Sequence, residues 1–273
     1  MRGTRPLIIA LSLLFSNIDI SLAYDERHLN KIKTQNACVK CDLSKSDLRK
    51  LNAKEASLMN ADFSGSVLAS GDFRSANLVK ANLRNSDLTA AKLNFANLQE
   101  ANLEKSILRH AILKNANLKG AKLRKADLSK ANLVGANLAR TNLTKAMLRH
   151  AILKNANLEG AKLRKADLSK ANLAGANLAR TNLTKAVLRK VNLKGANLAR
   201  TNLTKAVFRK VNLKGANLTA SNFHKSILQG VNLSGANLTR ADFTDAKIEN
   251  VWFVDALFCR TKMPWGLEAP HCK

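Results

Sequence analysis

A large apolar residue recurs at almost every fifth position from Leu43 to Phe258, and the register never slips. Of the 44 positions in this series, 35 are Leu and seven are Phe, and Ile248 and Ala53 complete the set. An α-helix cannot use this pattern, because five residues advance the chain by about 500° and successive leucines would move around the axis. In a strand, residues two apart share a face. The Leu and the small residue two before it therefore point inward together, and the remaining step of three turns a corner.

Internal duplications indicate how many corners make one coil. Residues 108–147 recur as 148–187 with three changes, and residues 188–207 resemble 168–187 with three changes. The duplicated blocks are multiples of four pentapeptides, and only the insertion of whole coils preserves stacking. The sequence therefore predicts four-sided coils with one pentapeptide on each side, and the 44 units divided by four give 11 coils. At the ~4.8 Å spacing of neighbouring strands, the rod is about 50 Å long.

The composition agrees with a core made of small, uniform parts. The chain has 273 residues, of which 46% are hydrophobic but only 4% are aromatic, and it contains 3 Pro and 12 Gly. Several ordinary domains would need more aromatic residues to fill their cores and more turn residues to separate their elements. A multi-domain enzyme is therefore not expected.

The units ANLKG, ADLSK and ANLVG, within residues 116–135, resemble those of the pentapeptide-repeat family, and the likeness extends over residues 41–258. The resemblance implies an all-β fold, a right-handed quadrilateral β-helix with stacked Leu or Phe centres. The flanking segments CVKCDLSKSDL and FCRTKMPWG are similar to those of secreted members of that family. Trp265 departs from the family's usual MPDG. We expect an N-terminal cap over residues 24–40 and a C-terminal cap over residues 259–273.

The first 23 residues have the three regions of a signal peptide. Arg2 and Arg5 are positively charged, Leu7 to Phe15 form an apolar stretch of nine residues, and Ser21 and Ala23 are the small residues before a cleavage site. Nine residues are too few to span a bilayer, which takes about 20. The sequence therefore predicts export, to the periplasm or the extracellular space, and an uncleaved N-terminal anchor is the alternative.

All four cysteines lie outside the long repeat run, at its two ends. Because most of the rod separates the pairs, the expected disulfides are local, Cys38–Cys41 and Cys259–Cys272. A thioredoxin-type CxxC would need a βαβ pattern, and haem attachment would need a His where Asp42 stands. A zinc site would need a fourth ligand beside Cys259, His271 and Cys272. Structural bridges suit an exported protein.

Catalytic motifs are absent from the sequence. No Ser has a His and an Asp in a motif context, and no phosphate-binding loop is present. His110 and His150 are copies of one position in duplicated blocks, and a solvated surface position is expected for both. The Asp and Asn residues before the centres follow the five-residue grid, which indicates turn and ladder hydrogen bonds. We expect no enzymatic activity and no cofactor.

The formal net charge is +27, and most of it is concentrated between Lys105 and Lys225, where 27 Lys and Arg face three acids. A coil of four pentapeptides places seven of these lysines in one column and four arginines on an adjacent side. These candidate polyanion-binding residues are Lys105, Lys125, Lys145, Lys165, Lys185, Lys205 and Lys225, with Arg109, Arg149, Arg189 and Arg209. A third side carries Arg140, Arg180, Arg200 and Arg240.

Two interpretations of this charge stay open. One is a non-catalytic exported scaffold that binds an anionic lipid surface, a cell-wall polymer or an acidic protein through its basic columns. The other is a structural solenoid whose duplicated lysines keep it soluble and protect its exposed strands from aggregation. A gyrase-directed mimic of DNA is disfavoured, because it would need a negative surface and a cytoplasmic location. Specific nucleic-acid binding is not expected, because Phe95 is the one outward aromatic residue in the middle of the run.

Overall fold

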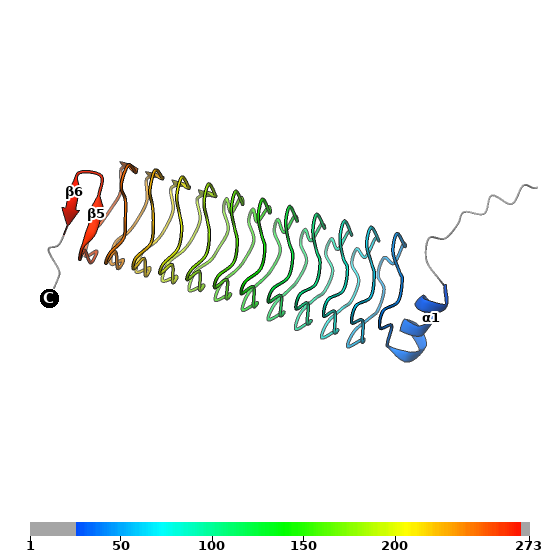
Figure 1. Cartoon of the computed structure of the whole chain (residues 1–273). Coiled ribbons are helices and arrows are strands. Elements are labelled where there is room, and N and C mark those ends of the chain that lie inside the picture. Colours follow the sequence, from blue (N-terminus) through cyan, green and yellow to red (C-terminus); the bar gives the residue numbers. More distant parts are fainter. Residues whose placement is uncertain (1–25, 269–273) are drawn as a thin grey trace, which may run out of the picture.

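The computed structural model describes residues 26–268, which form a straight rod (Figure 1). Helix α1 (Glu26–Gln35) lies at one end, and the hairpin of β5 (Thr261–Met263) and β6 (Gly266–Glu268) lies at the other. Between them the chain winds in coils, and parallel β-bridges join each unit to the fourth one after it, from Ala37↔Ser57 to Asp242↔Lys262. The predicted four-sided coil is confirmed. The predicted signal peptide and Cys272 lie outside the described residues.

One pentapeptide, residues 167–171, shows why the five-residue grid has its composition. Leu168 N–H donates to Val187 O in the next coil (2.9 Å), and Asp167 N–H donates to Ala146 O in the preceding one (3.0 Å). Lys170 N–H donates to Arg189 O (2.7 Å), and Ala171 N–H closes the turn on Leu168 O (2.9 Å).

The remaining amide of this pentapeptide, that of Ser169, donates to the side-chain Oδ1 of Asp167 at 2.9 Å. The Asp or Asn at the start of a unit therefore accepts from the one N–H that neither the coil-to-coil ladder nor the turn bonds. The same contact recurs at Asn137 and Asn182, which accept from the amides of Ala139 and Thr184. The expected turn and ladder hydrogen bonds are thus present, and all five amides of the unit are bonded.

The last residue of each turn adopts a left-handed backbone, and in most coils it is not glycine. Lys125 has φ +60°, Lys145 +61° and Lys165 +59°, and glycine occupies the equivalent place only in some units, such as Gly175 with φ +68°. A side chain in this region costs roughly 1–2 kcal/mol. The lysines are therefore held at the corners by the closed ladder, against their own backbone preference.

The interior of the rod is a stack of leucines with alanines at the corners. Leu168 and Ala166 are completely buried, and the aromatic rings near the C-terminal end stack on each other, with the centroids of Phe223 and Phe243 4.4 Å apart. Ile32 of α1 is 2% exposed and closes the N-terminal end of this core. The helix ends before Asn36, whose φ of +49° and N–H bond to Ile32 O form a left-handed cap.

One corner of the coil changes at residue 191. From Gly71 to Ala171 the inward residue of this corner is Gly or Ala, whereas Val191, Val211 and Val231 follow. At these valines the turn bond to the residue three before is not formed. The chain instead extends into short parallel strands with the order β1-β2-β3-β4. They are β1 (Val187–Arg189), β2 (Val207–Arg209), β3 (Ile227–Gln229) and β4 (Lys247–Glu249).

We expect Leu168→Asn to lower the free energy of unfolding by about 3–5 kcal/mol, because it removes a buried side chain and buries an amide in an apolar column. Lys170→Asn, two residues on, is the matched control. Lys170 is exposed and Asn tolerates its φ of +62°, so the change should be within about 0.5 kcal/mol. Urea unfolding measures both, and equal midpoints would contradict the inward assignment of Leu168.

Peptide mapping without reduction tests the cysteine pairing. The structure contains the predicted Cys38–Cys41 disulfide, with Cα atoms 5.3 Å apart. We expect the map to show this bridge and a second one between Cys259 and Cys272, because a link along the rod exceeds the ~4.4–6.8 Å that a disulfide spans. A peptide that joins Cys38 or Cys41 to either C-terminal cysteine of the same chain would contradict the rod.

Candidate functional site

The lysine column, defined as Lys105 and every twentieth residue to Lys225, lies along one corner of the rod. All seven side chains are exposed, and each belongs to the turn between two sides of the coil. Lys225 has Asp245 within 3.9 Å. The other six make no ion pair with any described carboxylate. The predicted column is therefore an uninterrupted row of ammonium groups, one strand spacing apart.

The three acids within this basic segment are all used internally. Arg109 pairs with Asp127, Arg149 pairs with Asp167 at 2.5 Å, and Glu159 lies 3.9 Å from Arg180. Two of the predicted polyanion-binding arginines, Arg109 and Arg149, are thus bound to carboxylates of the next coil. No acid of the segment is left to neutralise the lysine column.

The carboxylates of Asp127 and Asp167 are held in their charged forms. Asp127 is 5% exposed, and its burial opposes ionisation. Hydrogen bonds from Ser129 and Arg109 outweigh that effect and lower the pKa of Asp127 below its usual value. The pKa of Asp167 is lowered in the same way, since bonds from Ser169 and Arg149 exceed the effect of burial. These two ion pairs therefore stabilise the folded state by linkage.

Arg189 and Arg209 form a different arrangement on the same side. They are direct partners in the β1–β2 register, and each lies beside a lysine, Lys190 and Lys210. The positions of the two aspartates are taken here by Val207 and Ile227. These four cations line an open groove of about 890 Å³, and Trp252 lies in its lining as well. Sequence reasoning named the arginines but not this groove.

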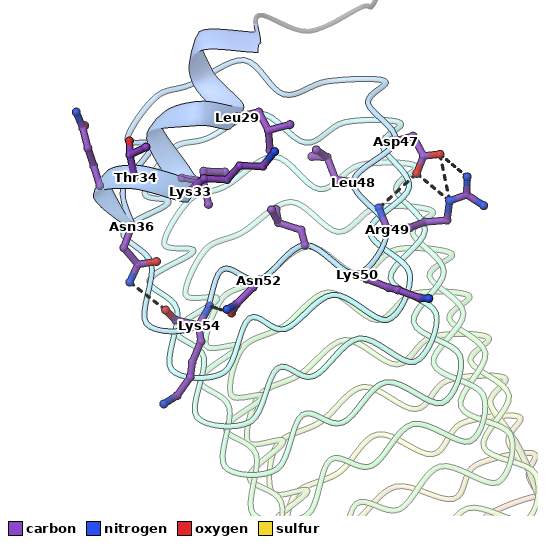
Figure 2. Close-up of a pocket in the computed structure, with 13 residues that line it drawn as sticks. Leu29, Lys33, Thr34, Asn36, Asp47, Leu48, Arg49, Lys50, Asn52 and Lys54 are labelled. Atoms are coloured by element: carbon purple, nitrogen blue, oxygen red, sulfur yellow. Dashed lines mark hydrogen bonds and ion pairs between the residues drawn. The ribbon is translucent and has the colours of Figure 1, made fainter.

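A second hollow, of about 930 Å³, lies where α1 crosses the first coil (Figure 2). Its polar groups already bond one another. Asp47 accepts hydrogen bonds from the guanidinium group and the backbone amide of Arg49, and Asn36 donates to Lys54 O at 3.0 Å. The hydrogen bonds of Arg49 lower the pKa of Asp47. This hollow is the seam between the helix and the solenoid, and we assign it no ligand.

The histidines within residues 26–268 do not come together. His110 and His150 are exposed and two coils apart, and Nδ1 of His28, in α1, lies 3.1 Å from Asp42 O. Among residues 26–268, no group of three His, Cys, Asp or Glu side chains could hold a metal ion. Over these residues, no helix has the length and apolar composition that a membrane span requires.

Acid unfolding should depend on Asp127 and Asp167. Because their pKa values are lowered on folding, their contribution is complete above the usual Asp value of 3.8 and is lost as the pH falls through the folded values. The free energy of unfolding should therefore hold down to about pH 4 and then decrease. Asp127→Asn and Asp167→Asn keep the turn acceptor but remove the charge, so both variants should lose less stability on acidification.

Asp255→Asn is the control for this experiment, because Asp255 is exposed at a turn. Its pH profile should follow that of the parent. If Asp127→Asn or Asp167→Asn had the same acid-induced loss as the parent, measured by urea unfolding at each pH, the ion pair of that aspartate would not contribute to stability.

The solved structures that are similar to this chain include HetL, Rfr23 and QnrB1. HetL, a pentapeptide-repeat protein involved in heterocyst differentiation regulation from the cyanobacterium Nostoc sp. strain PCC 7120, is 30% identical over 81% of this chain and 94% of its own, with a TM-score of 0.45. Rfr23 from the cyanobacterium Cyanothece 51142 is 32% identical over 41% of this chain and 92% of its own, with a TM-score of 0.28.

Full-length QnrB1, a plasmid-mediated fluoroquinolone resistance protein, is 17% identical over 70% of this chain and 84% of its own, with a TM-score of 0.22. No curated protein sequence matches the chain significantly. The sequence profile of the pentapeptide repeats matches residues 38–65 and, in overlapping stretches, residues 72–253, with eight copies. The protein is therefore a member of the pentapeptide-repeat family and folds as a right-handed quadrilateral β-helix.

Proposed function

We propose that this protein is a non-catalytic exported scaffold that binds an anionic polymer or surface of the cell envelope through its lysine column. Support for export comes from the N-terminal segment, where Arg2, Arg5 and the apolar run from Leu7 precede small residues. Support for binding comes from the described surface. An exported basic protein encounters anionic lipid headgroups and cell-wall polymers before it encounters nucleic acid.

One observation carries the proposal: six lysines of the column, from Lys105 to Lys205, have no described carboxylate partner, although every acid of that segment is paired. Two unit charges ~4.8 Å apart repel by roughly 0.9 kcal/mol in water before salt screening. A bound polyanion relieves this repulsion along the whole column at once. The rigid ladder already holds the lysine stems at one spacing, so binding costs little backbone conformational entropy.

A solubilising surface is the competing function, and the duplication of residues 108–147 favours it. Copying a coil copies its lysines whether or not they bind anything. Exposed lysines also hinder edge-to-edge association of strands. Under this alternative the position of the lysines is unimportant, and only their number affects the behaviour of the protein.

The triple variant Lys125→Asn, Lys165→Asn and Lys205→Asn tests the position. Asn occupies the same column at Asn85, with φ +56°, so the variant should fold. We expect the parent to be retained by anionic lipid vesicles or by an anionic cell-wall polymer at ~0.15 M salt, where long-range attraction is screened. The variant should lose most of this retention, and its dependence on salt should be shallower because fewer counterions are released.

The matched control removes the same charge from another corner, with Lys114→Asn, Lys154→Asn and Lys194→Asn. These lysines are exposed and equally spaced, but they lie on a different corner. The control should keep most of the parent's retention. Equal loss in both triple variants, or no retention of the parent at this salt concentration, would favour the solubilising function.

A further inference from the structure

The groove lined by Trp252 is a distinct site within the basic surface. It has a volume of about 890 Å³ and lies over β1, β2 and β3, next to the corner where valine replaces alanine. Two Arg-Lys pairs from successive coils line it. Asn212 and Asn232 also belong to its lining. It therefore combines positive charge, neutral polar groups and an aromatic ring in one hollow.

The arginines of this groove have lost the partners that their copies keep. In earlier coils the arginine of this column pairs with an aspartate of the next coil, as Arg149 does with Asp167. At the equivalent places Arg189 and Arg209 meet Val207 and Ile227, and neither arginine pairs with a described carboxylate.

Asp167, the acid in the coil before β1, is already paired with Arg149. On the other side, Glu249 of β4 lies two strands beyond Arg209. It accepts a bond from the side-chain amide of Gln229 at 3.0 Å. Two planar guanidinium groups thus line the groove with their donors available for a ligand.

Gly230 opens the groove where the column would otherwise continue with lysine. Lys190 and Lys210 precede it at the same corner, with φ +54° and +53°, and Gly230 has φ +64°. A Cβ at Gly230 would meet the Cγ of Lys210 at 3.6 Å, which is ordinary contact. A lysine at this place is therefore compatible with the fold, as it is in the two preceding coils, and its absence leaves space in the groove.

Trp252 stands where the preceding coils carry asparagine. Asn212 and Asn232 occupy the same column, and Asn232 is the bridge partner of Trp252. The indole is 54% exposed, although large aromatic residues usually lie inside. Asn212 donates its amide to Asn192 at 3.5 Å, whereas Asn232 makes no such bond to Asn212 within the described ladder. The amide donors of Asn232 are consequently available beside the ring.

We propose that this groove binds a segment of an anionic polysaccharide, with its acidic groups on Arg189 and Arg209 and one sugar ring against Trp252. Guanidinium groups bind carboxylate, sulfate and phosphate oxygens with two parallel hydrogen bonds. The free amide of Asn232 suits sugar hydroxyls. Single-stranded nucleic acid fits less well, because its platforms stack successive bases on several aromatic residues and this groove has one.

The inference rests on the proposed function and names the ligand class of one site on the same surface. The distinguishing variant is Gly230→Lys, which adds a positive charge but fills the groove. Simple attraction of polyanions would be unchanged or stronger in this variant. Binding in the groove should become weaker by about tenfold or more, which is about 1.4 kcal/mol.

The experiment measures the affinity of the parent for oligogalacturonate, inorganic polyphosphate and oligo-dT by isothermal titration at ~0.15 M salt. We expect the parent to prefer oligogalacturonate. Gly230→Lys and Trp252→Asn should each lose about tenfold of that affinity while polyphosphate binding stays within about twofold. Trp252→Asn restores the residue of the preceding coils, so folding should be retained, and a urea unfolding curve checks this for both variants.

Four results would overturn the inference, and in three of them the parent still binds at least one probe. Oligogalacturonate could bind no better than polyphosphate, Gly230→Lys could bind it as well as the parent does, or oligo-dT could bind best. In the first two cases the lysine column would still account for binding, and the proposed function would stand. If the parent bound none of the three probes, both the groove and the proposed function would be rejected.

Discussion

The rest of the structure depends on the hydrogen-bonded ladder between successive coils. Each unit donates and accepts along the rod axis, so every residue has a fixed neighbour in the coil above and the coil below. This constraint keeps the leucines stacked and holds lysines in a left-handed backbone conformation that is unfavourable for them. Because of the ladder, residues that are twenty apart in the sequence also stack into one column on the surface. The lysine column and the groove lined by Trp252 both arise from residues that are stacked in this way.

The period of five and the duplicated blocks were sufficient to predict the coil, its four sides and the position of the lysine column. They were sufficient because every unit bonds its amides in the same pattern, within itself and to the adjacent coils, so the register can be counted along the sequence. The Cys38–Cys41 bridge followed from the separation of the two ends. Helix α1 was not predicted, because its short amphipathic pattern around Leu29 and Ile32 does not continue into the repeats.

The groove lined by Trp252 was missed for a different reason. In and around it the columns change: Gly230 replaces lysine and Trp252 replaces asparagine in the lining, and Val191 replaces alanine and Val207 replaces aspartate beside it. Each is a single ordinary substitution in the linear sequence. Only the stacking of coils shows that the four substitutions meet at one corner. Aligning the sequence in rows of four pentapeptides would have shown them as neighbours.

In a four-sided coil, inserting one pentapeptide and inserting four pentapeptides have different effects on the surface. Adding one pentapeptide would keep each leucine buried, yet it would rotate every later residue by a quarter of the perimeter and split each surface column in two. Adding four pentapeptides would lengthen all columns and disturb none. The duplications in this chain are of the second kind. Rod length and surface pattern can therefore vary independently in descendants of this gene, and a longer rod can carry the same groove unchanged.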